Sequence, residues 1–528
     1  MRLLAPSIML TASALVAALP ATAVGDQSHA DDASSERAPT LAASSPRMSV
    51  LAPGVRLERH QYGRADANDR WAVHVYLPAK LSGPLDEADT ALGSRKIAGR
   101  VAEALRAEAF SPKLAAVRTP NFSDYKARRL GWTVRVGTFA SEGEAQERLD
   151  AIGEAGFNGG LRFTAQDGND RKAPQRAYVL RVDFKKFRGT VGAGHGKTVF
   201  GTETLTTLLE RSGAIAGTNA QWFYESGSGG LYVKNGKLLG TATQGRGGIK
   251  ITRGGRKVDV GTYTSKVVLR AGKKRALLDA VNRVPGIIWN CGGIGGDKPT
   301  QRAQHDLRCT DDSEMVRFTP QWGDTPSGDG AEVVINRHGR VVKVNDSRGA
   351  AVPPQGSTIQ ATGARAKWLV RNLAVGKKVR INETVRNGKG KRVKLRKGTT
   401  ILQVGPTLVR NGKIDVNARA DGLIRQGNDK TFTYNWVVRS NPRSMIGMDK
   451  RGRLMLVVVD GRQAGYSEGL SVIDTARMMK RLGAREALNL DGGGSSVMAV
   501  GGQGIVNRPS DSTGQRSLGN VLLIKPKH

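Results

Sequence analysis

Two buried strands joined by a single helix, near the C-terminus, constrain the fold of this chain more than any other feature. Residues 453–460 and 487–490 are almost wholly apolar. The predicted helix between them begins at Ser471 and ends before Gly483. Strands that are apolar on both faces are typical of the interior of a sheet. We therefore predict a buried sheet in which these two strands pair in parallel through a right-handed crossover.

Each of these strands leads into a carboxylate, since Asp460 ends the first and Asp491 follows the second. Parallel strands end at the same edge of a sheet, and open α/β sheets bind ligands at this edge. The four residues after Asp491 are Gly492, Gly493, Gly494 and Ser495. Glycines without Cβ atoms allow backbone amides to approach an anionic or bulky group, while Asp491 would hold a water, a sugar hydroxyl or a metal. The alternative is a tight turn that Asp491 caps.

From about residue 190 onward the chain has the pattern of a β-rich protein. Short alternating segments meet at Asn235-Gly236, His338-Gly339 and Asn411-Gly412, which are hairpin turn pairs. Glycine accounts for 67 of 528 residues, about twice its usual share, without the Gly-X-Y period of collagen. We therefore expect many tight turns between short strands.

The hairpin predicted over residues 386–397 is strongly basic. Seven of its twelve residues are Lys or Arg, and no acidic residue occurs between 384 and 414. The whole chain has 82 Lys and Arg against 46 Asp and Glu, a net charge of +36. A surface of this charge attracts polyanions such as nucleic acid, anionic lipid headgroups or phosphate-bearing wall polymers. The hairpin is either a solvated loop or a ribbon that faces such a polymer.

Residues 50–185 are predicted to form a small α+β region with a weak internal repeat, in which an alternating strand is twice followed by a helix. The second helix begins with a capping box made by Ser141 and Glu144. The expected strands are at residues 71–76, 132–139, 161–164 and 178–184, and the first helix is at 97–109.

The second strand and helix of this region resemble the SPOR domain. The resemblance rests on Gly137-Thr-Phe139, on Ala145 near the start of the helix and on Gly156-Phe157 before the next strand. It implies that residues 50–185 bind the glycan strands of peptidoglycan. The alternative is a small α+β module without a ligand.

The N-terminus has the features of a secretory signal peptide. A single arginine precedes a largely apolar run from residue 8 to 19, and Ala21-Thr-Ala23 provides a cleavage site. An uncleaved anchor is the alternative, which the flanking prolines and the shortness of the run disfavour. We assign residues 1–23 to the signal peptide and 24–49 to a flexible leader.

Export determines which partners and bonds we expect. It allows Cys291 and Cys309 to form a disulfide, and it argues against nucleic acid as the physiological partner. No later stretch is long and apolar enough to span a membrane, so the mature chain should be secreted or associated with the cell wall. Two cysteines and seven scattered histidines give little support for a zinc site.

One segment matches the pattern of a catalytic serine. Gly465-Tyr-Ser467-Glu-Gly469 has the spacing of a nucleophile elbow, but such an elbow joins a strand directly to a helix. Several loop residues intervene here, so we interpret the segment as the entry loop of the helix.

Residues 440–524 closely resemble the phosphodiester glycosidase family. The order and spacing of six motifs support this, namely Asn441-Pro-Arg443, Val458-Val-Asp460-Gly-Arg462, Ser467-Glu-Gly469, Leu488-Asn-Leu-Asp491-Gly-Gly-Gly-Ser495, Val506-Asn507-Arg-Pro-Ser-Asp511 and Gln515-Arg516. Weaker similarity extends upstream to about residue 200 and includes Asn219. Ala220 and Gln221 depart from the glycines of the family pattern, and the segment 291–309 and the basic hairpin resemble insertions.

The resemblance implies hydrolysis of a sugar-1-phosphate diester at the anomeric carbon. The leaving phosphate is already anionic, so it needs charge neutralisation more than a strong acid. Arg443, Arg462 and Arg516 are the candidates, although each alternatively forms a structural ion pair. Asp491 or Asp460 would activate water or stabilise the oxocarbenium-like centre. The residues that would hold sugar hydroxyls, or with the aspartates a Ca²⁺ or Mg²⁺ ion, are Asn219, Asn507 and Asp511.

Together these patterns predict a mixed chain of the α+β or α/β class. One or more small SPOR-like βαβ modules would precede a β-rich, mixed-sheet catalytic domain over residues 190–528. We expect a secreted hydrolase of glycosyl-1-phosphodiester linkages in cell-wall or exopolysaccharide glycans, with anionic or phosphate-linked glycans and peptidoglycan as partners. The alternatives are a non-catalytic protein of wall binding or exopolysaccharide assembly, and a secreted binder of nucleic acid or heparin-like polymers.

Overall fold

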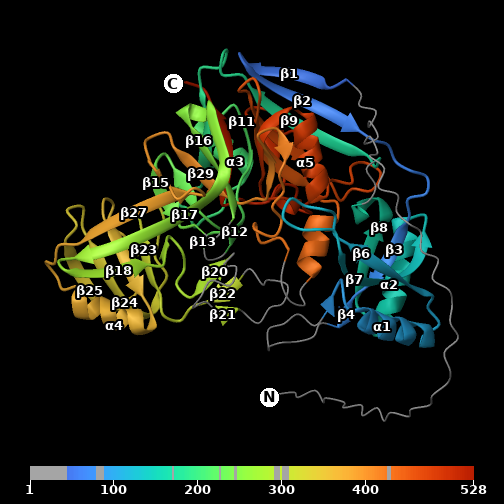
Figure 1. Cartoon of the computed structure of the whole chain (residues 1–528), viewed down its shortest axis with the longest axis horizontal. Helices are drawn as coiled ribbons and strands as arrows, with labels where there is room; N and C mark the ends of the chain where they lie inside the picture. Colours follow the sequence, from blue (N-terminus) through green and yellow to red (C-terminus); the bar gives the residue numbers. More distant parts are fainter. Residues whose placement is uncertain are drawn as a thin grey trace, which may run out of the picture. The chain divides into compact units, whose positions relative to one another are not determined.

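Strands dominate the part of the chain that the structure describes, and together with a few helices they form a mixed α+β fold (Figure 1). The computed structural model describes residues 45–78, 89–168, 172–224, 227–242, 246–289, 298–299, 308–424 and 430–527. The predicted signal peptide, 1–23, and the predicted leader up to residue 44 lie outside the described residues. No helix within the described ranges is long and apolar enough to cross a membrane.

An eight-stranded sheet, called the central sheet below, contains the predicted buried strands. Its strands in spatial order are β1 (Arg47–Ala52), β2 (Val55–Tyr62), β9 (Gln175–Val182), β33 (Leu454–Val459), β32 (Arg443–Asp449), β34 (Ala484–Asn489), β30 (Thr407–Arg410) and β31 (Lys413–Ile414). Every residue of β33 is buried, as its apolar sequence predicted. β1 begins inside the predicted leader, because its residues pair with those of β2.

The predicted direct pairing of the two C-terminal strands is wrong. β33 and β34 do run in the same direction, but β32 lies between them and pairs with both in the antiparallel sense. The strand-helix-strand pattern could not reveal this, because β32 precedes both strands in the chain. The helix that connects them is α5 (Val472–Arg481), which is capped by the Ser471 hydroxyl and followed by Gly483 in a left-handed conformation, φ +90°.

A second sheet brings the segment around Asn219 to the end of β34. Its spatial order is β10 (Thr190–His195), β37 (Asn520–Lys525), β11 (Ala216–Asn219), β35 (Met498–Val500) and β36 (Gly504–Ile505). Helix α3 (Leu205–Ser212) packs against it through three buried leucines. Asp491 N donates a hydrogen bond of 2.8 Å to Ala220 O, which fixes the end of β34 against the end of β11.

The long strand β17 (Lys257–Ala271) joins two parts of the fold. Its first half pairs with β16, and its second half pairs with β18 and β27. The sheet order is β15 (Lys237–Gly240), β14 (Tyr232–Lys234), β29 (Thr400–Gln403), β16 (Gly247–Thr252), β17, β27 (Arg380–Asn387) and β28 (Arg392–Val393), with β18 (Lys274–Leu278) beside β17.

The second half of β17 shares a hydrophobic core with another sheet, and this core is separate from that of the central sheet. The order of that sheet is β19 (Ala280–Val281), β23 (Met315–Phe318), β26 (Ser357–Ala361), β24 (Gly328–Ile335) and β25 (Val341–Arg348), and helix α4 (Gly363–Asn372) contributes Leu369 to the core. The three predicted hairpins are present, as β14–β15, β24–β25 and β30–β31. Asn235, Gly236, Asn411 and Gly412 all have positive φ, as two-residue hairpin turns of this kind require.

Residues 71–163 form a small βαββαβ unit, called the small module below. Its elements are β3 (Trp71–Val75), α1 (Arg95–Ala107), β6 (Pro112–Arg118), β7 (Arg129–Phe139), α2 (Glu142–Glu154) and β8 (Gly159–Phe163). The sheet order β6-β7-β3-β8 is that of a split βαβ fold. The capping box predicted at Ser141 and Glu144 is present at the start of α2.

The small module is narrower than the predicted region 50–185. β2 and β9 flank it in the chain, but they pair with each other, and β9 also pairs with β33 in the central sheet. The alternation of residues 178–184 predicted a strand correctly, but a local pattern does not contain the identity of a distant partner. The small module is therefore an insertion between two neighbouring strands of the central sheet.

The remaining described elements are short. They are β4 (Leu77–Pro78), β5 (Asp89–Thr90), β12 (Phe223–Tyr224), β13 (Gly227–Ser228), β20 (Ile287–Trp289), β21 (Lys298–Pro299), β22 (Arg308–Thr310), the 3₁₀ turns η1 (Thr164–Asp167), η2 (Arg253–Gly255) and η5 (Gly493–Ser495), and the π-helix η4 (Thr433–Val438). Cys291 and the side chain of Cys309 lie outside the described residues, so their disulfide stays a prediction.

Candidate functional site

Three chain segments meet at one edge of the central sheet. β33 ends before Asp460, β34 ends before Asp491, and the antiparallel β32 begins at Arg443. Arg443 lies opposite Val459 in the ladder, directly beside the end of β33. The predicted placement of both aspartates at one edge is therefore confirmed, and the inserted strand adds a cation to them.

Asp491 is held at the start of the glycine loop, which we define as residues 491–496. Its Oδ1 accepts a hydrogen bond of 2.9 Å from Gly492 N, and the Ser495 side chain also hydrogen-bonds to the carboxylate. Burial raises the pKa of Asp491 to about 6, against the opposing effects of these hydrogen bonds and of Arg516. A carboxylate with this pKa is ionised at neutral pH yet can accept and return a proton near it.

Each glycine of the loop lies against an arginine or its backbone. A Cβ on Gly492 would be 2.9 Å from Pro442 O and would touch Arg443. On Gly493, φ +60°, it would be 3.3 Å from Arg462 Nη2, and on Gly494 it would be 2.6 Å from Arg516 Nη2. A side chain at Gly492 would meet backbone, whereas one at Gly493 or Gly494 would displace the ends of Arg462 or Arg516. The structure thus places Gly492, Gly493, Gly494 and Ser495 in one loop with the three predicted arginines around it.

Arg443 is fully buried and has no carboxylate partner among the described residues. Its Nε donates to Leu470 O at 2.9 Å, and its Nη2 donates to Trp436 O at 2.5 Å. The guanidinium lies 4.7 Å from the centre of the Trp436 ring, while Nη1 is buried without a hydrogen-bond acceptor in the described structure. Burial, with Arg462 nearby, lowers the pKa of Arg443 to about 9. A buried cation of this kind is stabilised by an anion that occupies the site.

The other two arginines differ from each other in their partners. Arg462 donates twice to Asn441 Oδ1, at 3.1 and 2.7 Å, so it is held by a neutral group. Arg516 instead forms an ion pair with Asp511, at 2.6 Å between Nη2 and Oδ2. Hydrogen bonds from Thr513 and Arg516 lower the pKa of Asp511 to about 2. Arg516 therefore forms the structural ion pair that was the alternative to phosphate binding. Among the described residues, Arg443 and Arg462 form no such pair.

Asp460 has more hydrogen-bond donors around it than Asp491. Asn507 Nδ2 donates to its Oδ1 at 2.8 Å, and Arg508 N lies 3.1 Å from both carboxylate oxygens. The Tyr466 hydroxyl is 3.5 Å from Oδ2. Burial raises the pKa of Asp460 to about 6, although these donors lower it. Asp460 therefore fixes the segment around residue 507 against the end of β33.

Asn219 and Asn507 hydrogen-bond to the segments that carry the two aspartates. Asn219 Nδ2 donates to Asp491 O at 2.7 Å, and its Oδ1 accepts a hydrogen bond from the Ser444 hydroxyl at 2.6 Å. Asn507 Oδ1 accepts from Met498 N at 2.8 Å while its amide group holds Asp460. Both side chains use their polar atoms to fix the loops, and the sugar-binding role of Asn219, Asn507 and Asp511 stays a prediction.

Ser467 has a structural environment. Its hydroxyl donates to Asp460 O at 2.8 Å and accepts a hydrogen bond from Arg176 N at 3.0 Å. The residue is fully buried, so the hydroxyl serves to connect β9 with the end of β33. This agrees with the interpretation of the segment as a loop before α5.

Two further cations near the site were missed by the sequence analysis. Arg439, just before the motif around Asn441, has its pKa lowered to about 10 by burial and by Arg162. Arg162 comes from β8 of the small module, and its Nε is buried without a hydrogen-bond partner in the described part of the chain. Arg439 adjoins a recognised motif, so its position was a usable signal. No sequence signal pointed to Arg162, because its position near the site depends on how the small module packs against the rest of the fold.

The small module reaches the site through the π-helix η4. Arg135 of β7 pairs with Asp167 at 2.7 Å and donates to the Tyr434 hydroxyl at 3.4 Å. Tyr434 and Val438 of η4 are buried together with residues of the small module. Trp436, which contacts Arg443, lies in the same π-helix. One short helix therefore contacts both the small module and the arginines of the site.

The carboxylates, histidines and cysteines of the described residues give little indication of a metal site. Within the described ranges no three His, Cys, Asp or Glu side chains form a cluster that could hold a metal ion. A Ca²⁺ or Mg²⁺ ion at the site stays a prediction.

Comparison with known proteins supports the resemblance in the C-terminal part of the chain. Residues 329–525 match the family model described as Phosphodiester glycosidase. N-acetylglucosamine-1-phosphodiester alpha-N-acetylglucosaminidase of Bos taurus is 30% identical over 105 residues, which is 20% of this chain and 19% of that protein. The prophage-derived protein YomE of Bacillus subtilis (strain 168) is 33% identical over 123 residues, 20% of this chain and 19% of its own length. The matches thus span about a fifth of these curated relatives.

Solved structures extend the likeness over nearly the whole fold. A candidate exported protein of Burkholderia pseudomallei K96243 has a TM-score of 0.81 and 27% identity, covering 93% of this chain and 97% of that one. A Synechocystis protein has a TM-score of 0.52 at 16% identity, over 92% of this chain and 81% of that one, and it shows a similar fold alone. The SPOR resemblance of residues 50–185 stays a prediction.

Proposed function

We propose that this protein is a secreted hydrolase that cleaves glycosyl-1-phosphodiester linkages in cell-wall or exopolysaccharide glycans. The observation that supports this most directly is Arg443, a buried cation without a described carboxylate partner beside the glycine loop. The family match over residues 329–525 contains Arg443, Asp460 and Asp491. Hydrolysis of a phosphodiester-linked sugar requires cations that bind the phosphate and a carboxylate that is ionised at neutral pH. Arg443 and Asp491 would provide these.

The phosphate would lie against the arginines. Arg443 and Arg462 have neutral partners, so an incoming phosphodiester does not have to displace a carboxylate from them. Gly492 N already donates to Asp491 Oδ1 and Gly493 N to Pro442 O, so the arginines would provide most of the contacts to the phosphate. Neutralising the leaving phosphate stabilises it as the bond to the anomeric carbon breaks.

Asp491 would act on the sugar side of the bond. Its pKa of about 6 leaves it ionised at neutral pH. An ionised carboxylate there can stabilise the positive charge that develops at the anomeric carbon or accept a proton from an attacking water. Asp460 would hold the neighbouring loop in position, because its oxygens already accept hydrogen bonds from Asn507 and Arg508.

Secretion and binding to the wall complete the proposal. The N-terminal sequence has the pattern of a signal peptide. The basic surface, with a net charge of +36, favours anionic or phosphate-linked glycans as partners. Peptidoglycan binding by the small module rests on its resemblance to the SPOR domain, and the split βαβ topology is compatible with it.

Turnover of a chromogenic sugar-1-phosphodiester tests the proposal, with Arg443→Met as the first variant. Met has a similar volume and removes the buried charge, but Leu470 O and Trp436 O lose a donor, so thermal unfolding serves as the folding control. We expect a loss of roughly 10²–10³-fold in kcat/KM. Arg451→Met is the matched control, since Arg451 is an exposed residue in the turn after β32.

Absence of turnover by the wild-type protein across a panel of sugars would contradict the hydrolase and leave the non-catalytic alternative. Equal turnover by Arg443→Met and Arg451→Met would instead remove the phosphate-binding role of Arg443.

A further inference from the structure

A basic groove is lined by residues of β17 and β27 and of neighbouring segments, and it includes none of the residues assigned to the site. It has a volume of about 1010 Å³. Six basic side chains line it, namely Lys237, Lys266, Arg270, Arg275, Arg317 and Arg392. The acid among its lining residues, Glu383, is already paired with Arg317. The groove therefore has an excess of positive charge that the protein does not neutralise there.

The pleat of β17 explains why two of these cations, Lys266 and Arg270, face away from the core. Val267 and Leu269 are buried in the core beneath the sheet. The alternate residues Lys266, Val268 and Arg270 therefore lie on the opposite face and line the groove. Side chains two positions apart on a strand are about 7 Å apart, so Lys266 and Arg270 are about 13 Å apart along the groove.

Three arginines stand side by side across this face. Arg270 on β17 is directly opposite Arg275 on β18 and Arg380 on β27. No hydrogen bond or ion pair to any of the three is found among the described residues. Like charges directly opposite each other destabilise a sheet. An anion bound across the row would remove this repulsion, so the row indicates a ligand with negative charge.

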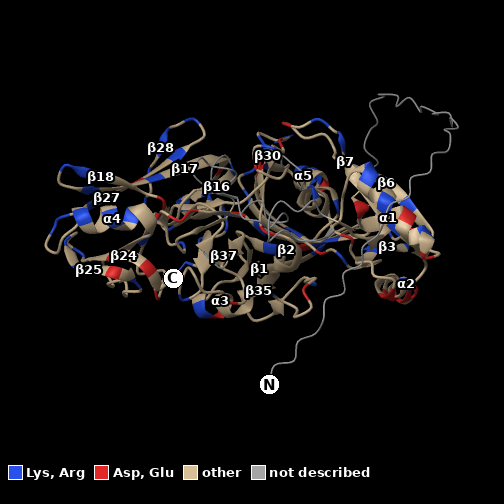
Figure 2. Cartoon of the chain, turned by 90° about the horizontal axis from the view of Figure 1, so that it is seen from below, with Lys and Arg blue, Asp and Glu red and all other residues tan. Residues whose placement is uncertain are grey.

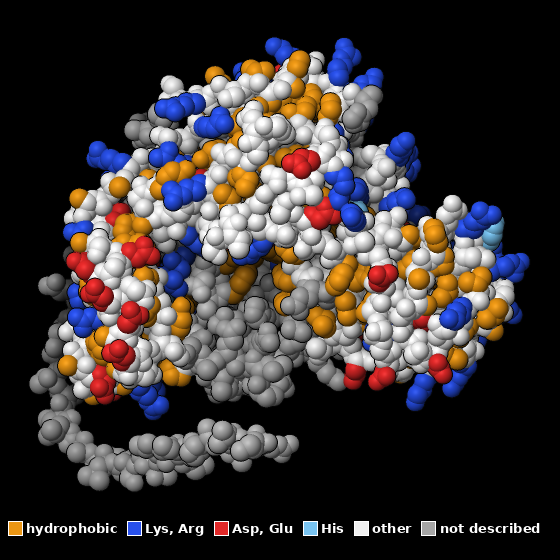
Figure 3. Space-filling model, turned by 180° about the vertical axis from the view of Figure 1, so that it is seen from behind, with side chains coloured by type: hydrophobic (Ala, Val, Ile, Leu, Met, Phe, Trp, Pro, Cys, Tyr) orange, Lys and Arg blue, Asp and Glu red, His pale blue; other side chains and the backbone are white. Residues whose placement is uncertain are grey.

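The charge is unevenly distributed over the molecule. Figure 2 shows Lys and Arg along the hairpin that contains β28 and on neighbouring elements. That hairpin belongs to the predicted basic segment 386–397, in which seven of twelve residues are basic. Figure 3 shows acidic side chains on the small module, where α2 carries Glu142, Glu144, Glu147, Asp150 and Glu154. A polyanion would therefore be drawn to the β17–β27 face and away from α2.

We propose that this groove is an accessory binding site for a phosphate-linked glycan chain, the polymeric form of the substrate in the proposed function on which this inference rests. A single phosphate spans only one or two of the cations, whereas a polymer with repeated phosphates can contact Lys266, Arg270 and Arg392 together. Asn382, Thr384 and Gln355 also line the groove and offer hydrogen bonds to sugar hydroxyls.

The lining argues for a sugar polymer over a single-stranded nucleic acid. Of the described residues that line the groove, none is aromatic. Proteins that bind single strands generally stack the bases on aromatic side chains. A glycan held by phosphates and hydroxyls needs no such platform.

One sheet connects the groove with the candidate active site. β17 and β29 belong to the same sheet, and soon after β29 Gly405 N donates to Asn489 O at 3.2 Å. Asn489 is the last residue of β34, two positions before Asp491. The groove and the glycine loop are thus built on one continuous framework, as a site that holds the polymer during hydrolysis requires.

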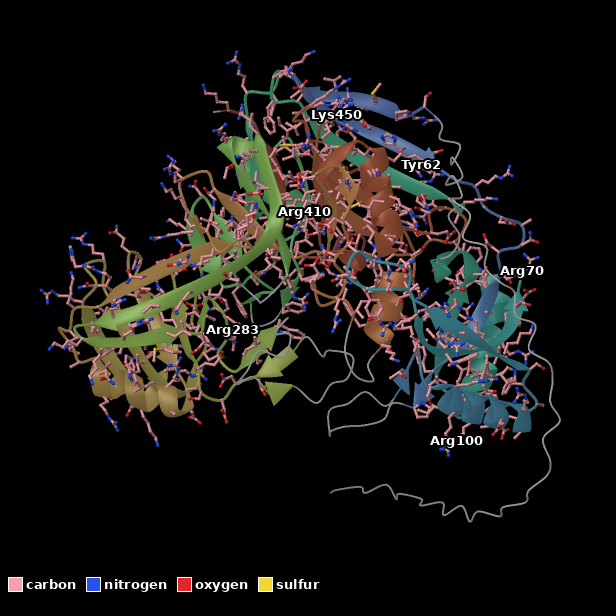
Figure 4. The ribbon with its side chains drawn as sticks, in the orientation of Figure 1. Tyr62, Arg70, Arg100, Arg283, Arg410 and Lys450 are labelled. Carbon is pink, nitrogen blue, oxygen red and sulfur yellow. The ribbon has the colours of Figure 1, made fainter. Side chains whose placement is uncertain are left out.

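The test compares two triple charge reversals in the full-length protein. The groove variant is Lys266→Glu/Arg270→Glu/Arg392→Glu. The control is Lys96→Glu/Arg100→Glu/Arg106→Glu on α1, which changes the net charge equally. All six side chains are exposed, and Figure 4 shows Arg100 pointing away from the helix. Circular dichroism and thermal unfolding confirm that both variants fold.

Binding of glycosylated poly(glycerol phosphate) is measured over a range of salt concentrations, with an uncharged glucan and an oligonucleotide as further probes. The groove variant should bind the charged polymer at least tenfold more weakly, and the slope of log K against log salt should fall by about 2. The control should stay within about twofold of wild type. The uncharged glucan should bind equally to the groove variant, the control and wild type.

Activity separates this inference from the proposed function. Groove reversal should leave turnover of the small sugar-1-phosphodiester unchanged while turnover of the polymer falls. Equal polymer binding by both variants, or equal loss in both, overturns the accessory site. Stronger groove-dependent binding of the oligonucleotide overturns the glycan as its ligand. If wild type does not turn over the small substrate but polymer binding still depends on the groove, the proposed hydrolase activity is wrong and the accessory binding site stands.

Discussion

The ends of β33 and β34 present two aspartates with similar pKa values in very different surroundings. Burial raises the pKa of both to about 6. Asp460 is hydrogen-bonded by Asn507, by the backbone of Arg508 and more weakly by Tyr466. Asp491 has Gly492 N and the Ser495 side chain, beside a loop surrounded by arginines. A raised pKa therefore does not by itself identify the reactive carboxylate, and the number of neighbouring donors distinguishes the two.

The largest effect should come from Asp491→Asn. Asn keeps the size of the side chain and can still accept from Gly492 N, but it cannot stabilise a cationic sugar or accept a proton. We expect turnover of a sugar-1-phosphodiester to fall by about 10²–10⁴-fold, with an unchanged circular dichroism spectrum. Wild-type turnover by a folded Asp491→Asn protein would show that the glycine loop is only a structural turn.

Gly494→Ala tests the close contact on the arginine side. The new Cβ would be 2.6 Å from Arg516 Nη2 and 2.9 Å from Asp511 Oδ2, so the ion pair must move. We expect kcat/KM to fall by about tenfold, with a loss of stability of roughly 1 kcal/mol. Gly452→Ala is a control for the glycine itself, because a Cβ there meets nothing within 4 Å, although its φ of +74° adds backbone strain. An effect on activity no larger than that of the control would argue against a tight arginine contact.

Asp460→Asn should be milder than Asp491→Asn. The amide oxygen can still accept from Asn507 Nδ2 and Arg508 N, and the amide nitrogen can donate to the Tyr466 hydroxyl. We expect a loss of stability of about 1 kcal/mol and a decrease in turnover well below that of Asp491→Asn. Thermal unfolding and steady-state kinetics on the same preparations measure both. A larger loss of turnover than with Asp491→Asn would exchange the roles of the two acids.

The pH dependence gives the smallest effect and opposite signs for activity and stability. Turnover should rise as pH increases through about 6, because Asp491 must be ionised. The pKa of Asp491 in the folded state lies above its ordinary value of 3.8, so the folded state binds more protons between about pH 4 and 6. This contribution to stability is lost as the pH rises through that window. Asp491→Asn should remove the contribution. An identical pH dependence of unfolding in both proteins would contradict the raised pKa.

Much of the site could be predicted because its residues adjoin strands with strong local patterns. The apolar run of β33 and the glycines after β34 placed Asp460 and Asp491 at one edge of the sheet. The resemblance to the phosphodiester glycosidase family then made these residues and the arginines candidates for the site. The position of β32 between these strands was not predictable, because pairing depends on distant packing and not on the local period. The same reason explains why Arg162 was missed and why β9 was assigned to the wrong sheet. The partners of Arg443 and Arg516 are also a tertiary property, so sequence could not tell an ion pair from an open anion site.

The small module leaves and re-enters the central sheet at neighbouring positions. Tyr62, labelled at the end of β2 in Figure 4, is paired with Gln175 at the start of β9. Loss of the small module in evolution would therefore leave β2 and β9 joined as a simple hairpin, with the pairing of the central sheet unchanged. Directly after the point of re-entry, Arg176 O accepts a hydrogen bond from Asp460 N at 3.0 Å. The point at which the small module joins the central sheet is therefore also hydrogen-bonded to the backbone of Asp460, at the end of β33.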